Sequence, residues 1–162
     1  MQLELKEKKN QKYSIQSLVA NAEQMLSRIE YLHKNGYVHR DIKPENFLFG
    51  LNKNKNTIYI IDFGLTKRYR DPKTKNHIPY KDNLPMNGTV RYASINTHLG
   101  IQQTRRDDLE TWIYCLVYLG RGDVPWQNPK KGDTIKEKYD IIMQRKMELT
   151  HEFVCKGLPS NL

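Results

Sequence analysis

Apolar residues near the start of the chain recur at steps of three and four, which is the spacing of one face of an α-helix. They are Ile15, Leu18, Val19, Ala22, Met25, Leu26, Ile29 and Leu32. Ser14 precedes them as a suitable N-cap, and Asn35-Gly36 follows them with residues that accept the left-handed conformation of a helix end. The pattern predicts an amphipathic helix of about twenty residues that packs one face against a core.

Two short runs of β-forming residues follow this helix. Residues 46–49 and 57–61 are rich in Phe, Leu, Ile and Tyr, and residues 50–56 between them are mainly polar. This arrangement predicts a β-hairpin with a long connection. Residues 62–105 show no helical period and contain Pro72, Pro79 and Pro85, which predicts a long ordered loop. Loops of that length inside a compact domain are usually functional or disordered.

The second half of the chain contains two further helical patterns. Residues 109–119 are apolar at nearly every position after Trp112, so we expect a helix that is buried on all sides, with Asp107 or Asp108 as its cap. Residues 134–149 predict another helix through apolar residues at helical spacing. Nothing after Lys156 predicts a closing element.

The composition adds a strong charge signal. The chain has 27 Lys and Arg against 18 Asp and Glu, a formal net charge of +9 at pH 7. That balance favours anionic partners, but it does not choose between nucleic acid, a membrane surface, nucleotide and acidic peptide. The two cysteines, Cys115 and Cys155, exclude a disulfide scaffold, and we expect both to be buried as small apolar residues. No signal-peptide segment and no apolar run long enough to span a membrane occur in the chain.

One segment concentrates residues that suit phosphoryl transfer, a reaction that depends on positioning and on neutralising phosphate charge. Residues 39–46 read His-Arg-Asp-Ile-Lys-Pro-Glu-Asn, and residues 62–64, just after the hairpin, read Asp-Phe-Gly. Asp41 can accept the proton of a substrate hydroxyl, and Lys43 can direct its ammonium group at the transferred phosphate. Asn46 and Asp62 stand at neighbouring ends of the hairpin, where two oxygen donors suit Mg²⁺. A lone loop aspartate is more often a turn or capping residue, so the prediction depends on the joint pattern.

This joint pattern resembles the catalytic-loop and metal-loop signatures of eukaryotic protein kinases. The downstream residues resemble casein kinase I in particular. Residues 88–100 read Gly-Thr-Val-Arg-Tyr-Ala-Ser-Ile-Asn-Thr-His-Leu-Gly, and residues 105–110 read Arg-Arg-Asp-Asp-Leu-Glu. Ser94-Ile95-Asn96 stands where most protein kinases carry an Ala-Pro-Glu-like motif. The resemblance runs from about Ser14 to the C-terminus.

The resemblance implies a role for each motif residue. Asp41 would be the catalytic base, with Lys43 and Asn46 beside it as catalytic residues. Lys43, Asn46 and Asp62 would bind the ATP, and Asn46 and Asp62 would be the Mg²⁺ ligands. The supporting residues would be His39, Arg40, Phe63, Gly64 and Asp108, with Asp108 holding the backbone of the catalytic loop.

The resemblance also implies the kind of substrate. Family enzymes favour a serine or threonine that follows a phosphorylated or acidic residue. Arg91 and Lys138 match positions that bind such anions in the family, and Gln127 lies nearby. A basic surface beside the site would concentrate acidic peptides there, and arginine binds phosphate through two parallel hydrogen bonds. A merely solvated basic face is the alternative, and the alignment near Lys138 needs a one-residue insertion within residues 130–133.

Two motifs of the kinase family are missing from the chain. It contains no Gly-x-Gly-x-x-Gly motif and no Val-Ala-Ile-Lys-like strand. By resemblance it is therefore a large lobe without the small lobe that covers the nucleotide, and we expect negligible kinase activity from these 162 residues alone. Ile113 stands where the family has glycine. The alternative function is a non-catalytic module that binds acidic or phosphorylated proteins. A nucleic-acid-binding role is a third possibility, which no recognition motif supports.

These inferences define the expected protein. We expect an α+β fold of the protein-kinase-like large, C-terminal lobe, mainly α-helical with a small β-hairpin and truncated at both ends. Residues 1–13 would be a loose lead-in and residues 14–162 a partial kinase domain. The expected function is serine/threonine kinase activity of casein kinase I type with ATP and Mg²⁺. We expect a monomer that acts on proteins inside the cell, in the cytoplasm or nucleus, without membrane binding.

Overall fold

The computed structural model describes residues 14–127, 129 and 132–158, so the expected lead-in and the last four residues lie outside the described part. The helices are α1 (Ile15–Lys34), α2 (Ile95–His98), α3 (Arg105–Arg121), α4 (Ile135–Glu148) and α5 (His151–Val154). Short 3₁₀ turns are η1 (Pro44–Asn46) and η2 (Asn52–Asn54). The strands are β1 (Tyr37–Val38), β2 (Phe47–Phe49), β3 (Ile58–Ile60) and β4 (Lys67–Arg68).

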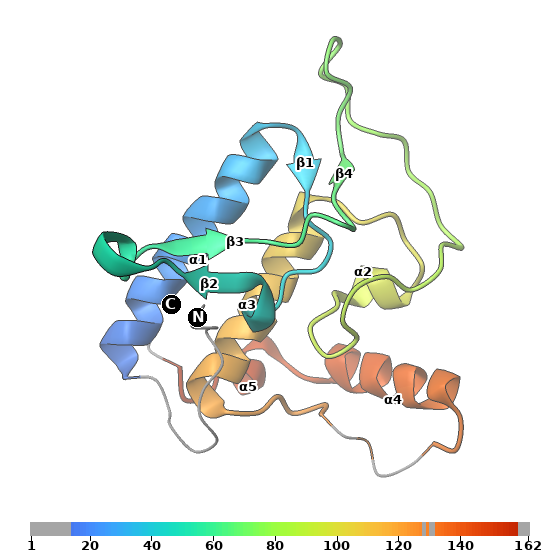
Figure 1. Ribbon diagram of the computed structural model, residues 1–162. Helices are drawn as coiled ribbons and strands as arrows, with labels where there is room; N and C mark the ends of the chain where they lie inside the picture. The colour runs from blue at the N-terminus through green and yellow to red at the C-terminus, as the bar shows by residue number, and fades with distance from the viewer. Residues whose placement is uncertain (1–13, 128, 130–131, 159–162) are drawn as a thin grey trace.

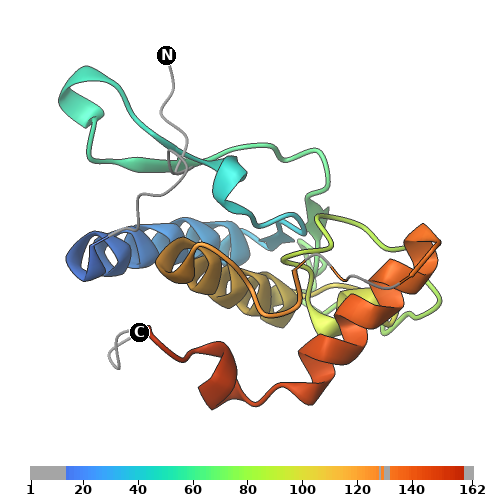
Figure 2. The same ribbon diagram turned by 90° about the horizontal axis from the view of Figure 1, so that it is seen from below.

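Helices α1 and α3 lie side by side and form the centre of the fold (Figures 1 and 2). The β2–β3 hairpin lies over one side of this pair, while α4 and α5 lie on the other side (Figure 2). The hairpin is antiparallel, with Phe47 opposite Ile60 and Phe49 opposite Ile58. The predicted first helix and the predicted hairpin are both confirmed. The helix was indicated by its apolar period, and the hairpin by two runs of β-forming residues around a polar connection.

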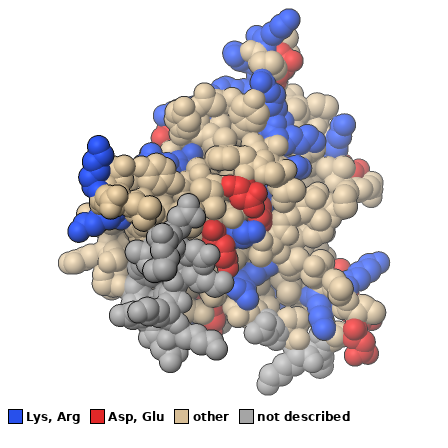
Figure 3. Space-filling model, viewed as in Figure 1, with Lys and Arg blue, Asp and Glu red and all other residues tan. Residues whose placement is uncertain are grey.

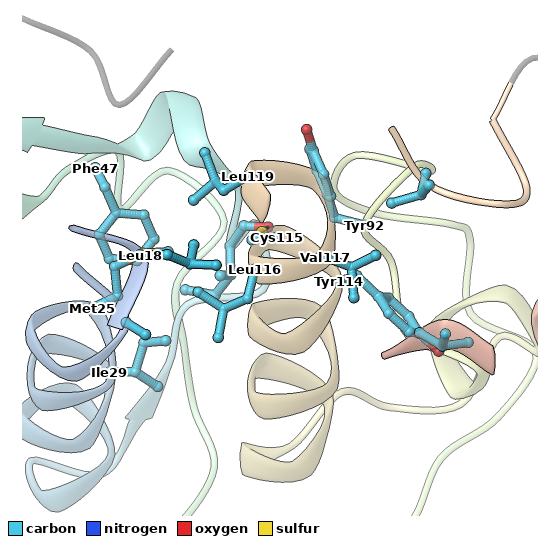
Figure 4. Close-up of a cluster of buried hydrophobic side chains, with 14 of the residues drawn as sticks. Leu18, Met25, Ile29, Phe47, Tyr92, Tyr114, Cys115, Leu116, Val117 and Leu119 are labelled. Atoms are coloured by element: carbon cyan, nitrogen blue, oxygen red, sulfur yellow. Dashed lines mark hydrogen bonds between the residues drawn. The ribbon is translucent and has the colours of Figure 1, made fainter. Parts of the chain in front are cut away.

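The core fills the space between α1, α3 and the hairpin. Leu18, Met25 and Ile29 of α1 face the side of α3 that carries Leu116, with Phe47 of β2 beside them (Figure 4). On the far side of α3, Tyr114 packs edge-on against Trp126 with ring centroids 4.7 Å apart. The apolar face of α1 is therefore buried against the core, as the sequence predicts.

Helix α3 begins earlier than its apolar pattern predicts. Its N-cap is Thr104, and Asp107 completes a capping box by accepting a hydrogen bond from the Thr104 backbone N–H at 2.7 Å. The prediction that Asp107 or Asp108 caps the helix was wrong, because both lie inside the first turn. The helix ends at Gly122, whose φ of 84° is the left-handed conformation that glycine favours. Leu109 is 39% exposed, so the helix is not buried on all sides.

The long segment 62–105 is more structured than a plain loop. Strand β4 pairs antiparallel with β1, with Val38 opposite Lys67, and α2 lies near the end of the segment with Ser94 as its N-cap. Both elements are shorter than five residues, which is too short for periodicity to reveal. Cys115 is buried as expected, but Cys155 is exposed, which corrects the prediction for that thiol. No described helix is long and apolar enough to cross a membrane.

Lys146 is a buried cation that the sequence pattern does not reveal. Its side chain on α4 is inside the fold, and Nζ donates hydrogen bonds to the carbonyl oxygens of Val90 at 3.0 Å and Ala93 at 2.6 Å. His98 Nε2 lies 3.2 Å from the same nitrogen. The bonds fasten α4 to the segment that leads into α2. Burial lowers the pKa of Lys146 to about 7, against a smaller opposing effect of Glu110.

The lowered pKa of Lys146 predicts a pH dependence of stability. Because the pKa is about 7 in the folded chain and ordinary in the unfolded one, the unfolded chain binds more protons above pH 7, and stability rises with pH. Burial also lowers the pKa of His98 to about 4, with a further contribution from Lys146, so His98 stays neutral throughout this range. Between pH 7 and 9 we expect the wild-type chain to gain about 1–2 kcal/mol relative to Lys146→Met.

Urea unfolding at pH 7, 8 and 9 measures this difference. Lys136→Met, on an exposed part of the same helix, is the matched control and should follow the wild-type pH profile. Parallel profiles for wild type and Lys146→Met would show that Lys146 does not change its charge in this range.

Candidate active site

The carboxylate of Asp41 lies at the centre of the predicted catalytic loop, between β1 and η1. Its Oδ2 is 2.6 Å from Lys43 Nζ, and its Oδ1 accepts a hydrogen bond from Thr89 Oγ1 at 2.8 Å. Asn46 Nδ2 donates to the Asp41 carbonyl oxygen at 2.8 Å and lies 3.4 Å from Oδ2. The structure therefore brings together the three residues predicted to be catalytic, around a carboxylate that is 8% exposed.

Asp62 follows the other strand of the hairpin, one residue beyond a backbone bond to Asn46. The backbone N–H of Ile61 donates to the Asn46 carbonyl oxygen at 2.9 Å, which continues the β2–β3 pairing up to the residue before Asp62. Asp62 then adopts a φ of 64°, and its Oδ1 accepts a hydrogen bond from Gly64 N at 3.3 Å. The hairpin thus places Asn46 and Asp62 next to each other. Acidic side chains lie just beyond the end of β3, beside basic ones (Figure 3).

The residues at this end of the hairpin suit a magnesium ion that also binds phosphate. Asn46 uses its amide nitrogen on Asp41, which leaves the amide oxygen as its potential metal ligand. Asp62 is exposed and adds a carboxylate. Within the described residues, His, Cys, Asp and Glu side chains do not gather in groups of three or more that could hold a metal. Two protein ligands completed by phosphate oxygens and water are a common arrangement for Mg²⁺.

Asp108 fixes the backbone of the catalytic loop from inside the fold. This carboxylate is 1% exposed and accepts hydrogen bonds from His39 N at 2.8 Å and from Arg40 N at 2.9 Å. The His33 ring, at the end of α1, donates Nε2–H to the same carboxylate at 2.8 Å. Arg40 adopts a left-handed φ of 70°, a conformation that costs energy in a non-glycine residue and persists because the surrounding bonds hold it.

The other supporting residues connect the catalytic loop to the segment that follows the hairpin. His39 Nε2 donates to the carbonyl oxygen of Ile61 at 3.0 Å, and the Phe63 ring meets the His39 ring edge-on at 5.6 Å. Arg40 Nε donates to the carbonyl oxygen of Leu65 at 2.5 Å. Burial lowers the pKa of Arg40, while the charge of Asp108 acts in the opposite direction. These contacts hold both predicted motif segments in one arrangement.

Two residues of the site were missed by the sequence reasoning. Thr89 holds the second oxygen of the Asp41 carboxylate, although it lies far along the chain in the long segment. Gly88 before it has a φ of 87°, and a Cβ there would come within 2.6 Å of the Arg40 carbonyl oxygen. Glycine is therefore required for the segment to approach the catalytic loop. The Gly88-Thr89 pair was visible in the sequence, but nothing local indicated its partner.

The three residues predicted to bind anions are only partly brought together. The Trp126 indole N–H donates to the Arg91 carbonyl oxygen at 2.8 Å, so Arg91 lies close to the segment that carries Gln127. The Gln127 Oε1 atom is buried and has no hydrogen-bond partner within the described part of the chain. The Arg91 guanidinium lies over the ring of Tyr118 at 5.2 Å. Lys138 is exposed on α4, and no described contact joins it to the other two.

The family assignment agrees with this geometry. A family model described as the protein kinase domain matches residues 2–156. The match covers nearly the whole chain, and the protein therefore belongs to the protein kinase family. Its mixed helices and small antiparallel sheets fit an α+β kinase-like fold, and protein kinases in general use ATP and Mg²⁺ for phosphate transfer.

Because Asp108 accepts three hydrogen bonds, we expect its loss to destabilise the folded chain. Asp108→Ala should lower the free energy of unfolding by about 3 kcal/mol or more, because it leaves buried backbone N–H groups without an acceptor. Chemical denaturation of the purified chain measures the loss. Asp123→Ala, which removes a carboxylate that is 67% exposed near the end of α3, is the control and should change stability by less than about 0.5 kcal/mol. Equal effects of the two substitutions would contradict the anchoring role.

Proposed function

We propose that this chain is the catalytic part of a serine/threonine protein kinase of casein kinase I type. In this proposal it is the large lobe of a domain that transfers the ATP γ-phosphate to serine or threonine in acidic or phosphorylated proteins. The observation that carries the proposal is the arrangement around Asp41. Lys43, Asn46 and Thr89 all contact that carboxylate or its backbone, and the backbone bond between Ile61 and Asn46 supports a role for the next residue, Asp62.

The geometry supports a defined role for each side chain. Asp41 would accept the proton of the substrate hydroxyl, since its carboxylate is held on both oxygens and cannot turn away. Lys43 would place its positive charge beside the transferred phosphate. Asn46 and Asp62 would hold a magnesium ion, which when bound neutralises phosphate charge. The chain's own contribution is thus positioning and electrostatic stabilisation rather than covalent chemistry.

The casein kinase I type is supported by the way the Ser94-Ile95-Asn96 sequence is held. Ser94 Oγ donates to Asp107 Oδ1 at 2.8 Å, and Ile95 N donates to Glu110 Oε1 at 2.8 Å. Both acceptors belong to α3. The sequence that distinguishes this type from most kinases therefore has its own set of partners, and these partners fasten the end of the long segment to the central helix.

The alternative function is a binding module without turnover. The 162 residues contain no Gly-x-Gly-x-x-Gly motif, the loop that covers the nucleotide phosphates in kinases, so these residues by themselves would bind nucleotide without that cover. A binding module has no need of Asn46 and Asp62 as metal ligands. Metal binding therefore distinguishes the two functions more directly than turnover, which we expect to be negligible for this chain alone.

The proposed metal site predicts Mn²⁺ binding that depends on Asp62. When Mn²⁺ is added with ATP to the ¹⁵N-labelled chain, paramagnetic broadening should begin at the amide signals of Ile61 and Gly64, and excess Mg²⁺ should reverse it. Asp62→Ala should weaken the apparent Mn²⁺ affinity by about tenfold or more, because one of two protein ligands is lost. Asp82→Ala, in an exposed part of the long segment, is the control. Broadening that is unchanged in Asp62→Ala would refute the magnesium site.

The proposed anion site predicts a preference for phosphorylated peptide. A fluorescein-labelled peptide with one phosphoserine before a serine should bind more tightly than its unphosphorylated form in fluorescence anisotropy. Lys138→Ala should weaken the phosphopeptide by about threefold or more, and Arg91→Lys should also weaken it, because lysine cannot form two parallel hydrogen bonds. Lys136→Ala, two residues away on α4, is the control. Loss of affinity for both peptides alike would argue against a phosphate-specific site.

A further inference from the structure

A groove separate from the candidate active site lies where the end of α1, the start of α3 and the segment around β4 come together. Its volume is about 810 Å³, within the roughly 300–1,000 Å³ typical of ligand sites. None of Asp41, Asn46 or Asp62 lines it. The groove is therefore a second concave surface, and the catalytic chemistry does not account for it.

The charge of this groove is strongly positive. Four of its lining residues, Lys34, Arg70, Arg105 and Arg106, are basic, and Glu30 is the only acidic one among the described residues that line it. Glu30 is engaged by Lys34 at 2.7 Å. The charges continue outside the groove along the segment that projects beyond β4, where basic side chains gather in Figure 3.

The two arginines at the start of α3 are placed where a cation is least stable. The first turn of a helix carries the positive end of the macrodipole, which disfavours positive side chains and attracts anions. Arg105 lies over the Tyr69 ring at 4.7 Å, and no carboxylate contacts it within the described part of the chain. Asp107 and Asp108 of the same turn are buried and use their oxygens inside the fold. The carboxylates near Arg105 are thus engaged elsewhere, Glu30 by Lys34 and the two aspartates inside the fold.

Apolar side chains make the rest of the groove suitable for a peptide. Leu26 of α1 and Leu109 of α3 line it and are 37% and 39% exposed. Tyr69 is buried, with its hydroxyl donating to the His33 carbonyl oxygen at 2.8 Å, so its ring is a fixed part of the wall. Arg106 Nε lies 3.7 Å from the buried Asp107 carboxylate, whereas no carboxylate within the described part of the chain contacts Arg105. Partly exposed leucines beside Arg105 match a protein segment that carries both apolar and acidic side chains.

We propose that this groove docks an acidic segment of a partner protein, in which aspartate or glutamate residues alternate with leucine or similar side chains. The carboxylates would pair with Arg105 and Arg106, and the apolar side chains would cover Leu26 and Leu109. The site is distinct from the surface near Arg91 and does not depend on phosphate transfer.

Fluorescence anisotropy tests the proposal with a labelled twelve-residue peptide of alternating Asp and Leu, compared with a peptide in which every Asp is Asn. The acidic peptide should bind at least about tenfold more tightly, and Arg105→Glu should weaken it by a similar factor. Arg106→Glu provides a second variant with the same expected direction. Lys73→Glu reverses the single positive charge of an exposed residue that does not line the groove, and it should change the affinity less than about twofold. Urea midpoints of all variants confirm that they are folded.

Several outcomes would overturn the docking site. Equal losses in Arg105→Glu and Lys73→Glu would mean that only net charge matters, and an unchanged affinity in both groove variants would mean that the peptide binds elsewhere. A twelve-nucleotide single-stranded DNA that displaces the peptide at lower concentration than unlabelled peptide would assign the groove to nucleic acid. If Lys138→Ala abolishes binding while Arg105→Glu does not, the peptide occupies the proposed substrate site. That result would refute the docking groove and leave the proposed substrate site intact.

Discussion

The structure depends on one buried carboxylate, that of Asp108. A charge that is removed from water must be compensated by hydrogen bonds, and Asp108 obtains them from the His33 ring and from the backbone N–H groups of His39 and Arg40. These donors come from the end of α1 and from the catalytic loop, while Asp108 itself belongs to α3. The loop therefore has the shape that satisfies this carboxylate, including the left-handed backbone of Arg40.

Further hydrogen bonds connect the loop that Asp108 holds to the other residues of the site. His39 and Arg40 bond to backbone carbonyls after the hairpin, and Gly88 allows the long segment to come close enough for Thr89 to reach Asp41. Each of these side chains lies on a loop, yet each loop is held by bonds to another part of the chain. Functional loops on a rigid support are common in enzymes, because the support fixes the geometry that the chemistry requires.

The basic residues of this chain serve different purposes. Lys146 is inside the fold, where its ammonium group replaces water as the partner of two carbonyl oxygens. Arg91 lies against the Tyr118 ring beside the proposed substrate surface, whereas Arg105 lies over the Tyr69 ring in a groove where no described carboxylate contacts it. The net charge of +9 is thus not a uniform property of the surface. Which surface binds anions depends on where individual cations have no carboxylate partner.

The sequence alone determined α1 and α4 through their apolar period and the hairpin through two runs of β-forming residues. It also indicated the motif residues around Asp41 and Asp62, because all of these signals are local. Tertiary structure decided the partner of Thr89, the burial of Lys146, the exposure of Cys155 and the groove beside Arg105. The start of α3 at Arg105 is set by a local capping box between Thr104 and Asp107, which an apolar period does not reveal. The polar first turn of α3 gives no apolar period, and contacts between residues far apart in the chain leave no local pattern.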